Sequence, residues 1–267
     1  MNQIALEIGP ISIYWYSIIM FLAILTGSYI FLKLAKKAGY QEEFLTNLIF
    51  YGIIFGIIGA RLYYIIFNLG YYTKNPIQII EIWNGGLAIH GAIISGAIWF
   101  IYYCKKHKKN FLKIFDLAVL GLIIAQAIGR WGNFFNQEAH GIKVAKETLE
   151  QMHIPKSIIN GMEIEGTYYH PTFLYESIWN ILGFILLIIL RKKYKTQPGT
   201  LTAIYFIWYS IARFIIESLR TDSLMLGNIK IAQLISALLF LAGILLLVHN
   251  YKKRKERNEK KWKKPTT

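Results

Sequence analysis

Long apolar stretches separated by short polar segments dominate the chain. A helix that crosses the hydrocarbon core of a bilayer, about 30 Å thick, needs about 20 mostly apolar residues. Seven stretches approach this length, which predicts an all-α, polytopic membrane protein with seven transmembrane helices. They are roughly 11–32, 44–67, 87–104, 111–129, 171–190, 200–218 and 229–249. The third is short and rich in glycine, so its limits are the least defined.

The composition agrees with a membrane protein rather than a soluble one. Hydrophobic residues make up 55% of the chain and charged residues 17%, whereas a soluble domain carries about 25% charged residues. A net charge of +15 would suggest nucleic acid for a soluble protein. In a membrane protein it is typical of cytoplasmic loops and of contact with anionic lipid. For the basic segment 250–267 we therefore expect membrane lipids, and not nucleic acid, as partners.

The positions of lysine and arginine predict the orientation of the bundle. The connections after the first, third and fifth predicted helices and the tail after the seventh hold 21 of the 30, and the other connections hold 7. The positive-inside rule then places the N-terminus outside and the C-terminus in the cytoplasm. Residues 1–10 contain no Lys or Arg, so 11–32 is expected to be a retained helix rather than a cleaved signal.

The predicted helices and connections suggest two parts. Residues 1–249 are expected to form one transmembrane domain, and 250–267 a basic cytoplasmic tail. The connection at about 130–170 is long, and long connections are usually functional or disordered. It is rich in aromatic residues, so we expect it to be folded, on the extracytoplasmic side.

Five costly polar side chains fall at one depth in this arrangement. An ionisable group in a membrane helix costs about 2.5–3.5 kcal/mol on insertion scales, so each needs a reason. With the first and third helices running inward and the second, fourth and sixth running outward, five spans bring polar groups to the outer leaflet. These groups are Tyr16, Arg61, His90, Arg130 and Arg213. Polar groups needed only for packing would have no reason to gather at one level.

The sixth predicted helix carries a polar stripe. Tyr209, Arg213, Glu217 and Arg220 are spaced so that they share one helix face. We expect Arg213 and Glu217 to pair, which lowers the cost of burying each; taken alone, such a pair could also serve only to fix helix packing. Because the planar fork of arginine fits phosphate and stays charged, the arginines suit an anionic phospholipid head group.

His90 and Tyr16 are candidates for the chemistry. A neutral imidazole can act as a general base, and glycines flank His90 on both sides. The alternative for a lone histidine in a membrane helix is an interhelical hydrogen bond. Tyr16 follows Trp15 near an interface, where aromatic residues are expected in any case.

The segment GRWGNFFNQEAHG at 129–141 concentrates polar residues just after the fourth predicted helix. Its glycines and the amides of Asn133 and Asn136 predict a turn that aims polar side chains inward. Glu138 is expected to balance the arginines or to orient His140.

Several classes of chemistry are not indicated. The chain has no G-x-S-x-G elbow, Walker loop or H-E-x-x-H zinc motif. The single cysteine, Cys104, lies at the cytoplasmic end of its predicted helix, which makes it a poor nucleophile candidate. His140, His153 and His170 have no spacing typical of a metal site. We therefore expect neither a metal nor a cofactor.

Six motifs together resemble the bacterial prolipoprotein diacylglyceryl transferase family. The segment at 129–141 is similar to the family signature, and five others occur in the family's order. These are IGPISIYWYS at 8–17, GARLYY at 59–64, WNGGLAIHGA at 83–92, HPTFLYES at 170–177 and RFIIESLRTD at 213–222. The likeness covers nearly the whole chain.

The resemblance implies an enzyme of the bacterial plasma membrane with its active site toward the outer leaflet. It would transfer the diacylglyceryl group of phosphatidylglycerol to the lipobox cysteine thiol of a prolipoprotein, releasing glycerol-1-phosphate. The resemblance implies that Arg130 and Arg213 bind the phosphate and that His90 and Tyr16 take part in catalysis. It also assigns required positions, which we expect to help bind phosphatidylglycerol: Asn133, Glu138, Gly141 and Glu217.

The sequence leaves both the thiol-activating group and the activity itself open. The thiol could be activated by His90, by Tyr16 or by the field of the arginines. A lipid flippase or transporter would also place arginines near head groups, but the inner halves of the first, third, fifth and seventh predicted helices are almost wholly apolar. A lipid-binding scaffold would need the arginines and no base.

Overall fold

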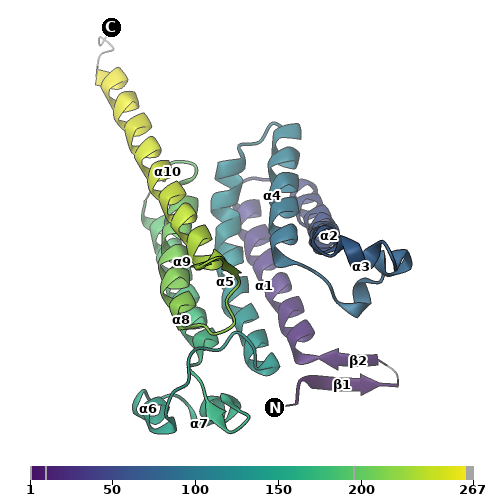
Figure 1. Cartoon of the computed structure of the whole chain (residues 1–267). Coiled ribbons are helices and arrows are strands. Elements are labelled where there is room, and N and C mark those ends of the chain that lie inside the picture. Colours follow the sequence, from purple (N-terminus) through teal and green to yellow (C-terminus); the bar gives the residue numbers. More distant parts are fainter. Residues whose placement is uncertain (1, 10, 195, 263–267) are drawn as a thin grey trace. The chain divides into compact units, whose positions relative to one another are not determined.

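The computed structural model describes residues 2–9, 11–194 and 196–262, and it is mostly helical (Figure 1). Six helices of the described residues are long and apolar enough to cross a membrane. They are α1 (Trp15–Lys37), α2 (Glu42–Phe67), α5 (Phe111–Asn136), α8 (Thr172–Lys193), α9 (Thr200–Leu219) and α10 (Ile231–Trp262), the last through its stretch Ile231–Glu256. The remaining predicted span forms as α4 (Ile89–Lys106), which is not among the six. Its histidine, glycines and two terminal lysines make it less apolar.

Short elements connect the long helices, and some of them correct the all-α prediction. The described residues include three antiparallel hairpins: β1 (Ile4–Ile8) with β2 (Ile11–Tyr14), β3 (Glu163–Ile164) with β4 (Thr167–Tyr168), and β5 (Met225–Leu226) with β6 (Ile229–Lys230). The short helices are α3 (Leu69–Tyr72), η1 (Pro76–Ile79), η2 (Ile82–Asn84), α6 (Lys146–Gln151) and α7 (Lys156–Gly161). In the first hairpin, Leu6 faces Ile13 and Glu7 faces Ser12. This alternation of apolar and polar pairs is typical of a strand.

Two predicted helix boundaries are wrong for identifiable reasons. The first span begins at Trp15 rather than 11, because 11–14 pairs with β1. The fourth runs to Asn136, so the turn expected after Arg130 is absent from this part of the described chain. Its glycines serve close packing instead: a Cβ at Gly132 would lie 2.9 Å from the ring of Tyr16.

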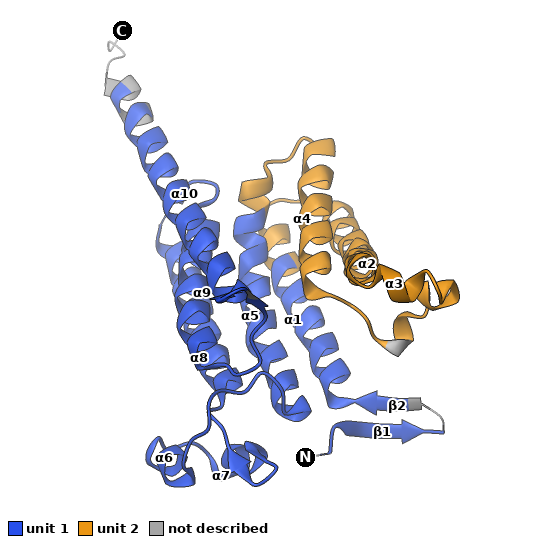
Figure 2. Cartoon of the chain, in the orientation of Figure 1, with its two compact units in different colours: residues 1–31, 115–267 blue, residues 32–114 orange. Residues whose placement is uncertain are grey.

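The chain divides into two compact units, residues 1–31 with 115–267 and residues 32–114 (Figure 2). The boundary falls within α1 and within α5. In the smaller unit, α2 and α4 approach through Gly59 and Gly91, where a Cβ on Gly91 would lie 2.2 Å from the carbonyl oxygen of Gly59. Small residues that let backbones approach closely are typical of helix packing in membranes.

In the larger unit, two features hold neighbouring helices together. A Cβ on Gly121 of α5 would lie 2.2 Å from the carbonyl oxygen of Gly27 of α1. Between α8 and α9, the indole of Trp179 donates to the carbonyl of Trp208 at 2.9 Å, and Trp208 donates back to Trp179 at 3.0 Å. These reciprocal bonds satisfy both indole N–H groups inside an apolar region, where an unpaired donor would be costly.

The buried carboxylate of Asp116 on α5 caps the N-terminus of α9. Its Oδ2 accepts the backbone N–H of Gly199 at 2.7 Å, and its Oδ1 accepts the N–H and the hydroxyl of Thr202 at 2.8 and 2.7 Å. The first N–H groups of a helix lack partners within the helix, and a negative charge there interacts favourably with the helix dipole. Asp116 therefore sets where α9 begins relative to α5.

Replacing Asp116 with asparagine is expected to destabilise the protein by about 2–4 kcal/mol, because the charge is lost and one amide N–H must face a backbone donor. Thermal unfolding of the purified protein measures this effect. Glu7→Gln is the matched control, since Glu7 is exposed on the first hairpin. An unfolding temperature equal to that of the control would contradict the capping role.

The connection between α5 and α8 is folded, as predicted from its aromatic content. It contains α6, α7 and the β3–β4 hairpin, and it shares an apolar cluster with the ends of α5 and α8. The buried members are Phe134, Leu149, Ile154, Ile158, Ile159, Met162 and Phe173. At the start of the segment 137–141, which carries predicted site residues, the amide of Gln137 donates to the carbonyl of Gly161 in α7 at 3.2 Å.

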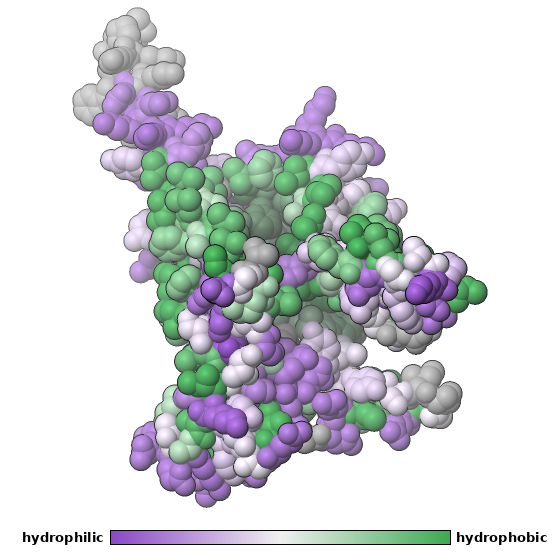
Figure 3. All heavy atoms as spheres, in the orientation of Figure 1, coloured by the Kyte–Doolittle hydropathy of each residue, from purple (hydrophilic) through white to green (hydrophobic). Residues whose placement is uncertain are grey.

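The last helix is longer than predicted and changes character along its length. It continues beyond 249 to Trp262, since lysine, arginine and glutamate are good helix formers. In Figure 3 its middle is hydrophobic and the part toward the C-terminus is hydrophilic.

Candidate functional site

A buried carboxylate in the larger unit joins the two predicted phosphate-binding arginines. Nη2 of Arg130, on α5, lies 2.6 Å from one oxygen of Glu176, on α8. Nη1 of Arg213, on α9, lies 2.9 Å from the other oxygen. Only 7% of the Glu176 side chain is exposed, against 21% of Arg130 and 13% of Arg213. Three helices thus bring two guanidinium groups to one carboxylate.

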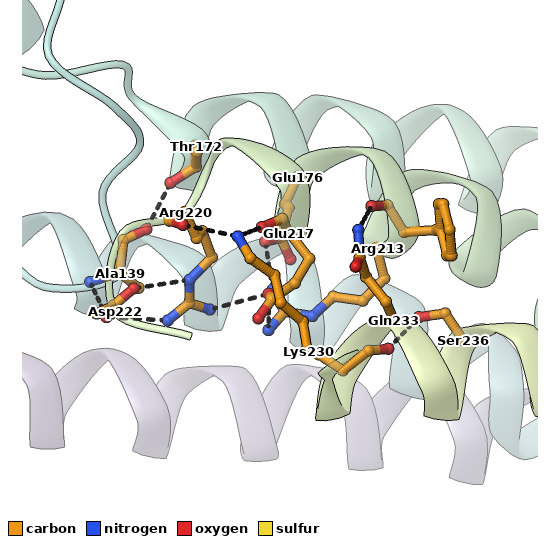
Figure 4. Close-up of polar contacts among 12 residues, drawn as sticks. Ala139, Thr172, Glu176, Arg213, Glu217, Arg220, Asp222, Lys230, Gln233 and Ser236 are labelled. Carbon is orange, nitrogen blue, oxygen red and sulfur yellow. Dashed lines mark hydrogen bonds and ion pairs between the residues drawn. The ribbon is translucent and has the colours of Figure 1, made fainter. Parts of the chain in front are cut away.

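The predicted pair on α9 is confirmed. Nη2 of Arg213 lies 2.8 Å from Oε2 of Glu217, whose side chain is 2% exposed. Arg220 adds a longer contact of 3.9 Å to the same oxygen. Arg213 therefore uses separate nitrogens for two carboxylates, an arrangement that a planar fork of donors permits (Figure 4).

The cluster continues into the segment after α9. Arg220 forms a bidentate ion pair with Asp222: Nε lies 3.0 Å from Oδ1, and Nη2 lies 3.0 Å from Oδ2. Oδ2 of Asp222 also accepts the backbone N–H of Ala139 at 3.2 Å, and Lys230 donates to the carbonyls of Glu217 and Arg220 at 2.7 and 2.9 Å. These contacts attach the signature segment 129–141 to the end of α9 (Figure 4).

The ion pair with Arg220 affects the acidity of Asp222. Partial burial alone would raise the pKa of Asp222, but the hydrogen bonds and charge of Arg220 outweigh it and lower that pKa below its ordinary value. A depressed pKa means that the pair contributes stability above the ordinary pKa of aspartate. The contribution is lost only as the pH falls through the depressed value. The link is therefore intact at neutral pH.

Charges in this cluster alternate in sign. Arg130, Glu176, Arg213, Glu217, Arg220 and Asp222 form a continuous chain of ion pairs. Burying one unpaired charge would cost several kcal/mol by order of magnitude, so each carboxylate lowers the cost of its arginine neighbours. The cluster keeps charged donors inside the protein at a low net charge.

Gly141 lies where no side chain fits. A Cβ there would lie 2.7 Å from Cβ of His170, and the backbone N–H of Gly141 donates to the carbonyl of His170 at 2.9 Å. Gly141 also forms an isolated β-bridge with Arg220. The absence of a side chain at Gly141 thus lets this position lie against both segments.

Asn133 and Glu138 are joined to each other. The Asn133 amide donates to Oε1 of Glu138 at 3.0 Å, and the backbone N–H of Glu138 donates to the carbonyl of Asn133 at 3.0 Å. Glu138 was expected either to balance the arginines or to orient His140. Among the described residues no contact joins Glu138 to His140. Nδ1 of His140 instead lies 3.1 Å from the carbonyl oxygen of Gly141.

Tyr16 lies in the first turn of α1, as predicted. Its ring packs against Gly132 of α5, two positions after Arg130. The larger unit therefore contains all the predicted site residues except His90.

His90 belongs to the smaller unit. It is the second residue of α4, as predicted for the first turn, and its ring centroid lies 6.1 Å from that of Tyr63. The neighbouring Gly91 packs against α2, which fixes the helix end that carries His90.

Arg61, also in the smaller unit, donates its hydrogen bonds to backbone carbonyl oxygens. Its guanidinium donates to the carbonyl oxygens of five residues in the loop before α4: Gln78, Ile79, Glu81, Gly85 and Gly86. Five donors are all that a guanidinium has. Arg61 is thus a structural residue that holds this loop, although its depth suggested a place beside the other arginines.

Two buried acidic residues were missed in the sequence. Glu176 and Asp116 both lie within predicted spans, so the cost of an ionisable group in a membrane helix was a sufficient signal. The same cost singles out Arg213 and Glu217, and it applies equally to these two carboxylates. The buried arginines also required a further carboxylate for charge balance, and Glu176 supplies it. Among the described residues, no three His, Cys, Asp or Glu side chains gather as a metal site.

Comparisons with known proteins point to one family. The family model of prolipoprotein diacylglyceryl transferase matches residues 3–249. A phosphatidylglycerol–prolipoprotein diacylglyceryl transferase of Staphylococcus carnosus (strain TM300) is 51% identical over 249 residues, covering 93% of this chain and 90% of that protein. The protein of the same name from Staphylococcus haemolyticus (strain JCSC1435) is 51% identical over 246 residues, covering 92% and 86%. That of Staphylococcus aureus (strain Newman) is 49% identical over 249 residues, covering 93% and 88%.

The match extends over the hairpin at the start of the chain, the helices of both units and the charged cluster. About half of the aligned residues are identical to those relatives. The chain therefore belongs to the prolipoprotein diacylglyceryl transferase family.

Proposed function

We propose that this chain transfers the diacylglyceryl group of phosphatidylglycerol to the lipobox cysteine thiol of prolipoproteins, the first step of bacterial lipoprotein maturation. Family membership and the names of the relatives support this activity. The observation that carries it is the meeting of Arg130 and Arg213 at one buried carboxylate. A phosphate has the same sign of charge and similar oxygen geometry, so it is a suitable ligand for the same two guanidinium groups.

The proposed setting is the bacterial plasma membrane. In it, α4 is the seventh span, the N-terminus is outside and the basic tail 250–267 is cytoplasmic. The distribution of lysine and arginine supports this orientation. Residues 1–249 then form the catalytic domain, with the region at about 130–170 outside the membrane and the site open to the outer leaflet. Phosphatidylglycerol and the signal peptide of the prolipoprotein are both accessible from that side.

In the proposed mechanism the phosphate of phosphatidylglycerol binds to Arg130 and Arg213. His90 takes the proton of the substrate thiol, because the thiolate is the reactive nucleophile. The thiolate sulfur attacks C3 of the diacylglycerol, a C–S bond forms and the C–O bond to phosphate breaks. The phosphate leaves with the bonding electron pair as glycerol-1-phosphate, and the arginines stabilise its charge. Direct displacement requires no nucleophile from the protein.

The other site residues take supporting roles in this proposal. Tyr16 contacts the substrates beside Arg130, and Glu217 holds Arg213 by the pair described above. Asn133 and Glu138 act as a hydrogen-bonded unit that contacts the glycerol head group. Gly141 permits the close approach that brings the signature segment to Arg220.

The purified full chain, incubated with phosphatidylglycerol and a lipobox peptide, tests the activity. Mass spectrometry should detect a diacylglyceryl thioether on the peptide together with released glycerol-1-phosphate. A peptide with serine in place of the lipobox cysteine is the control and should remain unmodified. Bound lipid without product would favour a lipid-binding scaffold, and lipid translocation without product would favour a transporter.

A further inference from the structure

We infer that Glu176 is a positioning residue that sets the spacing of the Arg130 and Arg213 guanidinium groups and limits their affinity for phosphate. This inference rests on the proposed function and concerns the same site. It assigns a role to the carboxylate itself, beyond the two arginines and the residues that the resemblance implies.

The geometry of Glu176 supports the spacing role. Its two oxygens are used by different arginines, at 2.6 Å and 2.9 Å, and those arginines come from different helices. Arginine side chains have many rotamers, and holding one in a single position costs conformational entropy. A carboxylate fixed on a third helix restrains both guanidinium groups before the substrate arrives, which is the preorganisation that electrostatic catalysis requires.

The two carboxylates have different partners, which explains why Glu176 affects the spacing of the Arg130 and Arg213 guanidinium groups more than Glu217 does. Glu217 contacts Arg213 and, at 3.9 Å, Arg220, so it restrains one end of the cluster. Arg130 has one ion pair among the described residues, and its partner is Glu176. Loss of this carboxylate would therefore release Arg130 from the cluster.

The charge of Glu176 supports the second role. With Glu176 and Glu217 beside them, Arg130 and Arg213 are balanced charge for charge. The phosphodiester of phosphatidylglycerol carries one negative charge, whereas a phosphate monoester carries about −1.5 to −2 at neutral pH. Two unbalanced arginines would hold the released monoester more tightly than the substrate, so the carboxylate favours product release.

Two variants of the full chain separate these roles. In Glu176→Gln the charge is removed at nearly constant shape. We expect kcat to fall, the KM for phosphatidylglycerol to fall, and the inhibition constant of glycerol-1-phosphate to fall by on the order of tenfold. In Glu176→Asp the charge is kept but the shorter side chain cannot reach both arginines. There kcat should fall while the inhibition constant stays near that of the wild type.

Glu163→Gln is the matched control, because Glu163 is an exposed carboxylate on β3 that accepts a hydrogen bond from Tyr168. A merely structural role of Glu176 would lower the fraction of protein that binds glycerol-1-phosphate, but it would leave both the inhibition constant and the rate per binding-competent site unchanged. Calorimetric binding of glycerol-1-phosphate to folded protein gives the same information without turnover. If Glu176→Gln does not fold, Glu176→Asp decides: a rate and an inhibition constant equal to those of the control would overturn the inference.

The proposed function and the proposed role of Glu176 can fail independently. If the wild type forms no thioether, the proposed function falls, while binding of glycerol-1-phosphate still tests the role of Glu176. If the wild type forms thioether and Glu176→Gln binds glycerol-1-phosphate as the wild type does, the inference is wrong and the proposed function stands.

Discussion

Replacing Arg213 with lysine is expected to lower the rate of diacylglyceryl transfer by about 10²–10³-fold, the loss typical of removing one well-placed donor for developing charge. Arg213 uses Nη1 for Glu176 and Nη2 for Glu217. A lysine keeps the positive charge but has a single nitrogen on a flexible stem, so it cannot hold two carboxylates and offer a planar fork to phosphate. The measurement is thioether formation from phosphatidylglycerol and a lipobox peptide.

Arg254→Lys is the matched control, because Arg254 is exposed on the basic part of α10. Thermal unfolding of both variants shows whether the cluster still folds. A transfer rate for Arg213→Lys close to that of Arg254→Lys would mean that positive charge alone suffices, and the bidentate role would be wrong.

Replacing His90 with alanine or glutamine is expected to lower the transfer rate by about 10²–10⁴-fold, the range for loss of a general base. Glutamine keeps a hydrogen-bonding group at the start of α4, so a purely structural histidine would be rescued by glutamine and not by alanine. The rates of thioether formation by the two variants are compared with that of His249→Gln, an exposed histidine on α10. Near-normal turnover in both variants would remove His90 from the role of base and leave Tyr16 or the arginines as candidates.

The long helices could be predicted because membrane insertion imposes a simple rule on sequence. Six predicted spans coincide with helices that are long and apolar enough to cross a membrane, because about 20 apolar residues have no other stable structure in lipid. The boundaries were less predictable. At Trp15 a local strand pairing decides the helix start. Toward Asn136 the helix continues through Gly132, which packs closely against Tyr16.

The site was partly predictable for a related reason. An arginine in an apolar helix is conspicuous, and the spacing of Arg213 and Glu217 was enough to predict their ion pair. The partner of Arg130 was not evident, because Glu176 is 46 positions further along the chain and only the packing of α5 against α8 and α9 brings them together. Arg61 shows the opposite case. Its expected depth in the membrane suggested a place beside the other arginines, yet its five donors go to backbone carbonyls.

Phosphate binding by the two arginines can be observed in a structure of the full chain in a lipid bilayer with phosphatidylglycerol bound. We expect the lipid phosphate to lie within hydrogen-bonding distance of the guanidinium groups of both Arg130 and Arg213, on the extracytoplasmic side. A phosphate held by other residues, or a cluster that opens only toward acyl chains or the cytoplasm, would contradict it.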